Sequence, residues 1–235
     1  MRHIYNTLAA FSLALAAMPL FSMASQAQET IGAAAIVRNQ VVRVDAGRNA
    51  PVTPGEAVFR NESVSTGDDS HAKLVFVDET NLAIGPKARV TLDRFVYAGT
   101  QTYAKATIGL AVGTFRFTTG NSQKKAYEID TPVATIGVRG TILDILSLKG
   151  RTTVTLVEGE ATVCTRGAGR KCGELLHPGD SITVTVSGGV SSVSFSRTGF
   201  SFASACGAAP GLCDRTTLAQ AAPGATGELA VLCGR

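Results

Sequence analysis

Hydrophobic and polar positions alternate in short stretches along most of the chain. In the segment His71–Val77, the even-numbered residues point to one face and the odd-numbered residues, Lys73 among them, point to the other. Gly, Pro, Asn or Asp separates each such stretch from the next. The expected strands are 33–37, 40–44, 56–59, 63–66, 71–77, 81–84, 90–95, 103–110, 112–117, 126–130, 142–148, 152–156, 160–164, 181–186 and 190–195.

Turn signals recur at roughly 7–12 residues, and no long segment of helical period precedes residue 200. This spacing predicts an all-β fold, namely a short-strand β-roll or solenoid-like domain, or a sandwich. The chain has no strict internal repeat, so a regular solenoid is not demonstrated.

The densest pattern is the run 131–141, in which β-branched residues are interrupted by proline and glycine. Gly137 and Gly140 indicate a bulge or a close approach of the backbone. No Gly-Lys-Ser/Thr sequence follows, so the run is not a phosphate-binding loop. We interpret five of its residues as determinants of the fold: Thr131, Pro132, Gly137, Gly140 and Thr141.

Arg139 is the one charged residue in this run, and a guanidinium among apolar neighbours must be exposed or paired. One interpretation is a partly buried arginine that binds carbonyls or a carboxylate across a turn, with Asp130 and Asp144 as candidates. The other is an arginine that faces a ligand or a partner, which makes Arg139 the candidate binding residue.

The two ends differ from the β-rich region between them. Residues 1–27 have the basic start, the apolar run and the Ser25-Gln26-Ala27 site of a cleaved signal peptide. The apolar run is too short to span a bilayer, and no span is expected in the mature chain. We expect a β domain over 28–197 and an Ala/Gly/Ser-rich, cysteine-containing tail over 198–235, loosely packed with one short helix at 215–221. The protein is therefore expected to be periplasmic or secreted.

All five cysteines lie in the last third of the chain. Export would place them where disulfides persist. Cys164 and Cys172 flank a Gly-rich turn, and Cys206 and Cys213 enclose a small loop, so these are the two expected pairs. Cys233 has no assigned partner.

The sequence contains few residues in arrangements typical of catalysis or ligand binding. The net charge is +4, or +3 without the signal peptide because Arg2 is its only charged residue, which does not favour nucleic acid. The mature chain has only His71 and His177, and neither a nucleophile motif nor a metal-ligand spacing is present. The acidic pairs 68–69 and 78–79 are expected to form solvated turns rather than a calcium loop. We predict no enzyme activity, no metal and no cofactor.

Six segments follow one another in a characteristic order: 64–86, 92–97, 113–117, 131–141, 154–163 and 176–184. The most distinctive is the Thr-Pro … Val-Arg-Gly-Thr run at 131–141. This ordered series resembles the FecR domain family, and the similarity covers about residues 31–186. One departure is Glu79, where the family usually has glycine, so this turn is not expected to need a positive φ.

The resemblance implies a sensory or regulatory domain of the cell envelope. Typical FecR regulators also carry a cytoplasmic segment that binds a sigma factor and one membrane helix, and this sequence shows neither, so the circuit is not implied. We expect a non-catalytic module that binds another envelope protein or a cell-wall or surface polymer. The alternative is an exported protein that binds a small ligand or polysaccharide, or a structural protein of the envelope. Its first aromatic candidates are Tyr97, Tyr103, Phe115 and Phe117.

Peptide mapping of the exported protein without reduction tests the cysteine assignment. The fragment containing Cys164 should be linked to the fragment containing Cys172. Recovery of both residues as free thiols would contradict the assignment.

Overall fold

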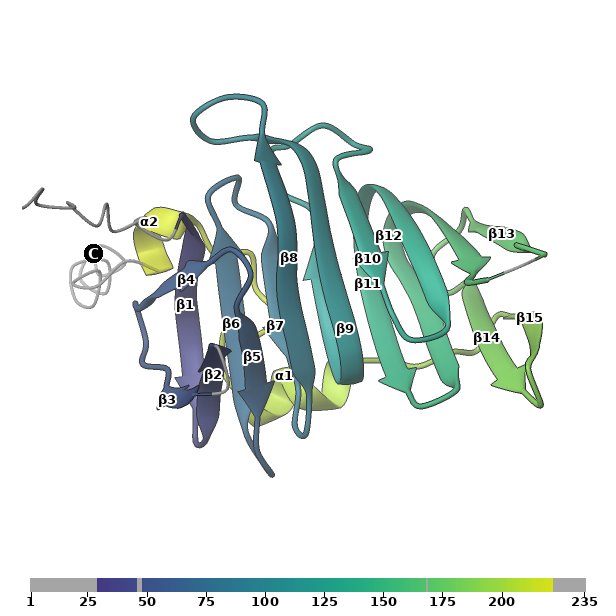
Figure 1. Ribbon diagram of the computed structural model, residues 1–235, viewed down its shortest axis with the longest axis horizontal. Helices are drawn as coiled ribbons and strands as arrows, with labels where there is room; N and C mark the ends of the chain where they lie inside the picture. Colours follow the sequence, from purple (N-terminus) through teal and green to yellow (C-terminus); the bar gives the residue numbers. More distant parts are fainter. Residues whose placement is uncertain (1–28, 46–47, 168, 222–235) are drawn as a thin grey trace, which may run out of the picture.

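The computed structural model describes residues 29–45, 48–167 and 169–221. The expected signal peptide (1–27) and Cys233 lie outside these residues. The described chain is a β-roll of fifteen strands joined in one hydrogen-bonded network, with two short helices near its C-terminal end (Figure 1). The all-β prediction is therefore correct.

The longest strands lie in the middle of the roll. In chain order the strands are β1 (Thr30–Arg38), β2 (Val41–Asp45), β3 (Arg48–Pro51), β4 (Ala57–Phe59), β5 (Ser63–Thr66), β6 (His71–Phe76), β7 (Asn81–Ile84), β8 (Arg89–Tyr97), β9 (Tyr103–Thr118), β10 (Tyr127–Asp130), β11 (Ala134–Leu148), β12 (Arg151–Thr165), β13 (Cys172–Leu175), β14 (Ser181–Ser187) and β15 (Val190–Ser196). The helices are α1 (Ala203–Ala208) and α2 (Leu218–Ala221).

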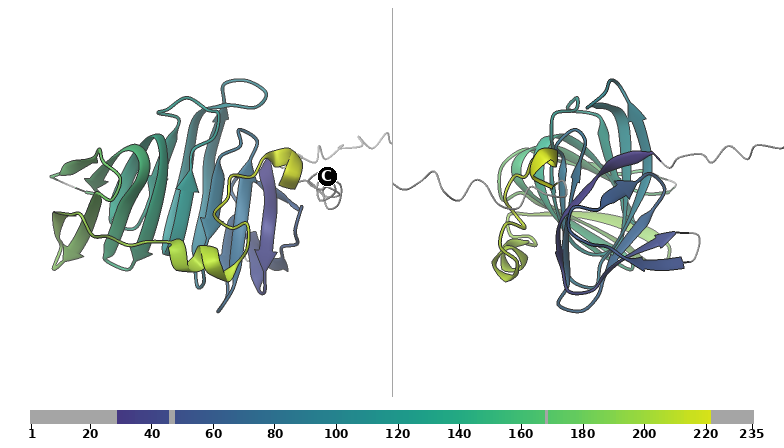
Figure 2. Two further views of the ribbon diagram at one scale, coloured as in Figure 1. Left: turned by 180° about the vertical axis from the view of Figure 1, so that it is seen from behind. Right: turned by 90° about the vertical axis from the view of Figure 1, so that its left-hand side faces the viewer.

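The strand register divides the roll into two layers. The first layer contains β4, β1, β6, β7, the second half of β9, the second half of β11, the first half of β12, β14 and β15. The second layer contains β3, β2, β5, β8, the first half of β9, β10, the first half of β11, the second half of β12 and β13. The view along the roll shows the strands curving around a common interior (Figure 2, right).

The three long strands β9, β11 and β12 cross from one layer to the other at a glycine. Gly113, Gly140 and Gly159 all have positive φ, at 119°, 67° and 86°. The β11–β12 register shifts between Arg139 and Leu143, where the two chains turn together. A Cβ on Gly159 would lie 2.0 Å from the Gly140 carbonyl oxygen, so the two corners are in direct contact. The Arg-Gly-Thr part of the run 131–141 is therefore a corner of the roll.

The sequence divides β9 wrongly. Separate strands were expected over 103–110 and 112–117, but one strand runs from Tyr103 to Thr118. The positive φ at Gly113 lets this strand turn the corner without a loop, so the glycine is a bend inside one strand. Strand β11 also continues through a glycine with positive φ, Gly140. It therefore starts at Ala134, whereas the sequence predicted a strand only from residue 142.

An aromatic row fills the interior between the layers. Phe95 packs on both Phe76 and Tyr103, with ring centroids 5.3 and 5.1 Å apart, and Phe117 packs on Tyr127 at 5.2 Å. The Tyr103 hydroxyl donates to the Ile31 carbonyl at 2.9 Å. The row is buried and its polar atoms are paired, so these aromatics stabilise the core.

Asp78 is buried, contrary to the expectation of a solvated turn. Its carboxylate accepts hydrogen bonds from the Thr80 N–H, the Thr80 hydroxyl and the Tyr127 hydroxyl, each at 3.0 Å. Burial, and secondly the Asp78 charge, raises the pKa of Tyr127 well above its ordinary value. Asp78 thus ties the β6–β7 turn to β10.

The Glu79 prediction is also wrong, since Glu79 has φ of 64°. The turn is closed by two backbone hydrogen bonds, from Glu79 N–H to the Phe76 carbonyl and from Phe76 N–H to the Thr80 carbonyl, each 2.9 Å long. These bonds and Asp78 impose the left-handed conformation on a residue that rarely adopts it.

The described part of the tail, residues 198–221, packs on the sheet through a few buried side chains, which corrects the expectation of loose packing there; residues 222–235 lie outside the described chain. Residues 198–217, here called the strap, cross the outer face of the first layer (Figure 2, left). Phe202, Ala209 and Leu212 are buried against Ala83 of β7. Helix α1 was not expected from the sequence, and the expected helix over 215–221 is reduced to α2, which packs on β1. The division of the chain at residue 197 remains a prediction.

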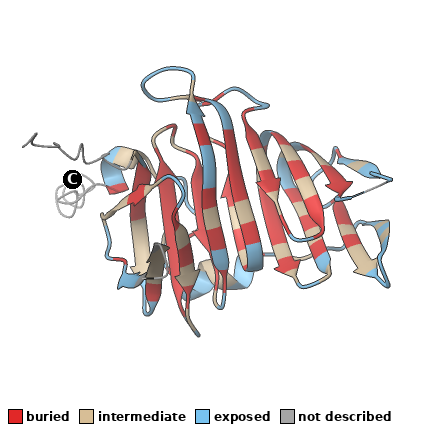
Figure 3. Cartoon of the chain, in the orientation of Figure 1, coloured by how far each residue is buried: buried red, intermediate tan, exposed pale blue. Residues whose placement is uncertain are grey.

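Lys73 lies under the strap. Lys73 lies on the outer face of β6, and the strap covers this face, so that all six residues of the strand are buried (Figure 3). Lys73 Nζ donates to the Gly211 carbonyl at 2.8 Å, to the Asp214 carbonyl and to the Thr216 hydroxyl at 2.5 Å. A buried ammonium with three acceptors holds the strap on the sheet.

A second buried charge holds the other end of the strap. Arg116 of β9 makes two hydrogen bonds to the Asp144 carboxylate of β11, at 2.7 and 2.8 Å. Asp144 also accepts the Phe202 backbone N–H at 2.9 Å, and the Arg116 guanidinium lies 6.0 Å from the centre of the Phe202 ring. The strap is therefore bound through its backbone and one aromatic anchor.

Two disulfides are present at the positions that the sequence indicates. Cys164–Cys172 joins facing residues of β12 and β13. Cys206–Cys213 closes the strap loop that contains α1.

Substitution of Gly159 by alanine tests the corner. The added Cβ meets the Gly140 carbonyl and forces an unfavourable φ, so we expect Gly159→Ala to lower the free energy of unfolding by about 2–4 kcal/mol. Urea unfolding measures the change. The matched control is Gly137→Ala, because nothing lies within 4 Å of its Cβ position, and it should change stability by roughly 0.5 kcal/mol or less. Equal losses in the two variants would contradict this account of the corner.

The pH dependence of stability tests Lys73. Burial lowers the pKa of Lys73 from 10.5 to about 8. Between these values the unfolded chain keeps the proton and the folded chain releases it, so stability rises with pH above 8. The free energy of unfolding of the wild type, relative to Lys73→Met, should therefore increase from pH 8 to pH 10.5. Parallel pH curves for the two proteins would contradict the prediction.

Candidate functional site

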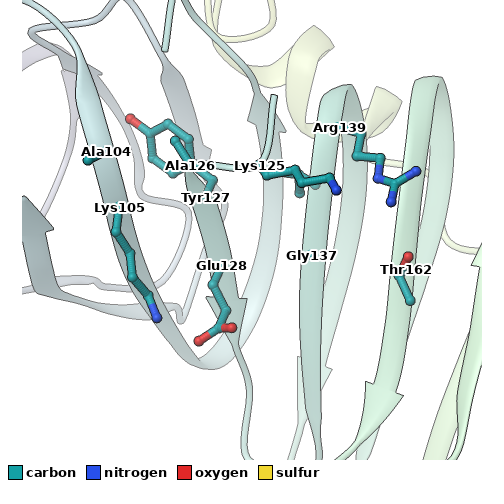
Figure 4. Close-up of a pocket in the computed structure, with 10 residues that line it drawn as sticks. Ala104, Lys105, Lys125, Ala126, Tyr127, Glu128, Gly137, Arg139 and Thr162 are labelled. Carbon is teal, nitrogen blue, oxygen red and sulfur yellow. The ribbon is translucent and has the colours of Figure 1, made fainter. Parts of the chain in front are cut away.

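The candidate site is a groove of about 370 Å³ on the outer face of the second layer (Figure 4). Strand β10 begins only at Tyr127, which pairs with Ala106 of β9, and the next residue, Glu128, pairs with Gly137 of β11. Above this point no strand fills the space between β9 and β11 in the described chain. The groove therefore lies where an inserted strand starts.

Gly137 lies at the floor of the groove, and its lack of a side chain leaves the floor open. Ile136 and Val138 on either side of it are buried, so the alternation of β11 places the missing side chain of Gly137 on the outer face. No atom lies within 4 Å of the position that a Cβ would take, and Gly137 is not among the residues with positive φ. The expectation of a bulge or close approach at Gly137 is wrong, because the glycine leaves space that a side chain would occupy.

Arg139 stands at the upper end of the groove, beside the corner at Gly140 (Figure 4). Its side chain is 49% exposed, and its guanidinium lies 3.8 Å from the Glu160 carboxylate, which is 56% exposed. Neither carboxylate expected from the sequence pairs with it: Asp144 binds Arg116, and Asp130 lies 3.9 Å from Arg166. An exposed pair of this length contributes little to stability, so Arg139 can reorient toward a partner.

Two lysines join Arg139 around the groove. Lys105 comes from β9 and Lys125 from the loop before β10, and both are exposed. Glu128 is the one acidic residue that lines the groove. Three cations from three segments around an open floor suit an extended anionic group, through contacts that salt screens.

The other residues of the run 131–141 have structural positions. The Thr131 hydroxyl accepts the Ala134 N–H at 2.9 Å and the Thr152 hydroxyl at 2.8 Å. The Thr141 N–H donates to the Thr119 hydroxyl at 2.9 Å, beside the corner. Pro132 is exposed in the turn between β10 and β11. The run thus contains corner and turn residues together with the groove residues Gly137 and Arg139.

Reasoning from the sequence did not identify Lys105 and Lys125 as partners of Arg139. Lys125 precedes a strand, and Lys105 lies at an exposed position within one, so both look like ordinary surface lysines. Only the parallel pairing of β10 with β9 brings them together, and no spacing in the sequence signals a parallel pair between segments so close in sequence.

The two histidines of the described chain lie at the start of β6 and in a turn before β14. His71 lies at the start of β6, and burial lowers its pKa. His177 Nδ1 lies 3.3 Å from the Asp180 carboxylate within one turn, and the same carboxylate accepts the His177 N–H. No set of three or more His, Cys, Asp or Glu residues within 29–45, 48–167 and 169–221 has the geometry of a metal site. In the same ranges, no helix has the length and apolar character needed to cross a membrane.

The chain is similar to one family model and to solved structures. No curated protein sequence matches the chain. Two crystal structures described as a "putative anti-sigma factor" from Parabacteroides distasonis ATCC 8503 match with 14% identity and TM-scores of 0.44 and 0.42. Each match covers 56% of this chain and 58% of the other, little more than half of either, and we base no conclusion on them.

The family model described as FecR protein matches residues 62–162. The match begins at β5 and ends in the second half of β12, so it contains the corners at Gly113, Gly140 and Gly159. It also contains every residue that lines the groove. Residues 62–162 of this chain therefore match the FecR domain family that the order of the sequence segments resembles.

Proposed function

We propose that the protein is a non-catalytic regulatory module of the cell envelope that binds another protein through the groove beside Arg139. The observation that carries the proposal is the position of the groove: all of its lining residues lie within the FecR segment 62–162. The expected signal peptide over 1–27 supports a periplasmic or secreted location. The absence of a catalytic motif in the sequence supports a binding role.

The chemistry of the groove favours an acidic protein segment as the partner. Lys105, Lys125 and Arg139 supply positive charge along its length. Strands on both sides give it the straight form that an extended peptide fits. The partner would thus place carboxylates beside the lysines and its backbone over Gly137.

Polysaccharide or small-ligand binding has less support. Among the described residues, Tyr127 is the one aromatic residue that lines the groove, and it is buried, so the groove offers no described ring face to a sugar. Tyr103, Phe115 and Phe117 pack in the core, and Tyr97 packs partly buried against it. In the described chain, hydrophobic side chains pack together in the interior between the layers.

Capture of partners from envelope extracts tests the proposal. We expect the double variant Lys125→Gln/Arg139→Gln to weaken capture of the partner by roughly tenfold, because each exposed ion pair contributes up to about 1 kcal/mol. Gly137→Val should also weaken capture, because it fills the floor of the groove while leaving the charges in place. Capture by the wild type should decrease as salt is raised.

The matched control is Lys149→Gln, which removes an exposed positive charge from the turn between β11 and β12. It should capture the partner as the wild type does. Equal capture by all four proteins would contradict the proposal. Capture of a polymer that is resistant to protease would favour the alternative partner class.

A further inference from the structure

Strand β15 forms a free edge of the roll. It is the last strand of the first layer and pairs only with β14 in the described chain (Figure 1). Its seven residues, Val190–Ser196, follow a two-residue turn at Gly188-Gly189, in which both glycines have positive φ. In such a hairpin Val190 exchanges backbone hydrogen bonds with Ser187, and every second residue after it bonds to β14 in the same way. The residues between them, Ser191, Val193 and Phe195, therefore direct their backbone N–H and C=O groups away from β14.

This edge lacks the features that protect exposed strand edges. Neither a charged residue nor a proline occurs between Ser181 and Ser196. The other edges differ: β3 ends at Pro51, β4 has three residues and is followed by Arg60, and β13 has four residues tied to β12 by a disulfide. An unprotected, uncharged edge is a template for another strand.

The interior of the roll is also open at this end. Phe195 pairs with Ile182, so the two side chains share the inner face of the layer. Ile182 is 1% exposed, whereas Phe195 is 56% exposed. Val193 is partly buried and packs against the core. Phe195 is therefore a core-facing residue without a covering partner in the described chain.

We propose that β15 pairs antiparallel with β15 of a second copy of this chain, which joins the two first layers into one continuous sheet. With the two-fold axis at Val193, Ser191 lies opposite Phe195 of the other copy and Ser192 lies opposite Ser194. The two Val193 side chains meet on the inner face, and each Phe195 is covered by the other roll. Such an isologous contact closes on itself and yields a dimer.

The edge itself supports a second copy as the occupant. A self-paired β15 places only serine, valine and phenylalanine opposite one another, and no charge is buried without a counter-charge. Arg197 would lie beyond the end of the paired segment, so the two arginines do not face each other. A charged partner segment would find no complementary charge on β14 or β15. The first strand, β1, and the last helix, α2, of the described chain lie toward the other end of the roll (Figure 1).

Sedimentation equilibrium of the purified mature chain tests the proposal. The wild type should show a concentration-dependent monomer–dimer equilibrium. The variant Ser192→Lys/Ser194→Lys places like charges opposite each other across the axis and should weaken the dimer by roughly tenfold or more. Both serines are exposed, so the variant should unfold in urea as the wild type does.

A charge-reversed variant identifies the partner as a second copy. Ser192→Glu/Ser194→Glu should also be monomeric alone, and an equimolar mixture of the lysine and glutamate variants should restore the dimer. The matched control, Asn49→Lys/Ala50→Lys on the exposed strand β3, should dimerise as the wild type does. A wild type that stays monomeric up to its solubility limit would overturn the proposal. So would lysine variants that dimerise normally, or a mixture that stays monomeric.

Discussion

The contact between the corners at Gly140 and Gly159 is the constraint on which the roll depends. Two adjacent long strands change layer at the same height, and the carbonyl of one corner occupies the space where a side chain of the other would lie. Positive φ at both positions turns the strands without ending their pairing. The interior exists because the strands close around it in this way. The core lies inside that closure. The groove also depends on it, because Arg139 precedes the corner at Gly140 and Glu160 follows the corner at Gly159.

The outer face of the first layer has a different role from the outer face of the second. On the first layer, Lys73 donates to two strap carbonyls and to the Thr216 hydroxyl, and Asp144, paired with Arg116, accepts the Phe202 N–H of the strap. On the second layer, Arg139 and the two lysines remain exposed around an open floor. One set of charges thus stabilises the molecule by binding its own chain, and the other set is available to a partner. This division is why we assign recognition to the second layer.

Much of the fold could be predicted from local patterns, because strand alternation and turn residues depend on near neighbours in sequence. The disulfide pairs follow from spacing for the same reason. The layer change within β9 and the positive φ of Glu79 could not be predicted, since both depend on hydrogen bonds between distant strands. Lys73 shows the limit most clearly. The alternation of the strand places Lys73 on one face but does not show what covers that face, and a segment more than a hundred residues later in the chain covers it. At the groove, Arg139 could be identified because it is the one charged residue in an apolar run. Lys105 and Lys125 could not be identified as groove residues without knowledge of the β9–β10 pairing.

The central claim is that the groove in the FecR segment contacts a protein partner in the cell envelope. Photo-crosslinking in intact cells tests it most directly, with a photoreactive amino acid placed at Ala104, which is exposed and lines the groove, or at Lys149, which is exposed elsewhere. We predict a discrete crosslinked protein band from position 104 that is absent from position 149 and is lost when Gly137→Val is added. The same band from both positions, or no band from position 104, would contradict the account.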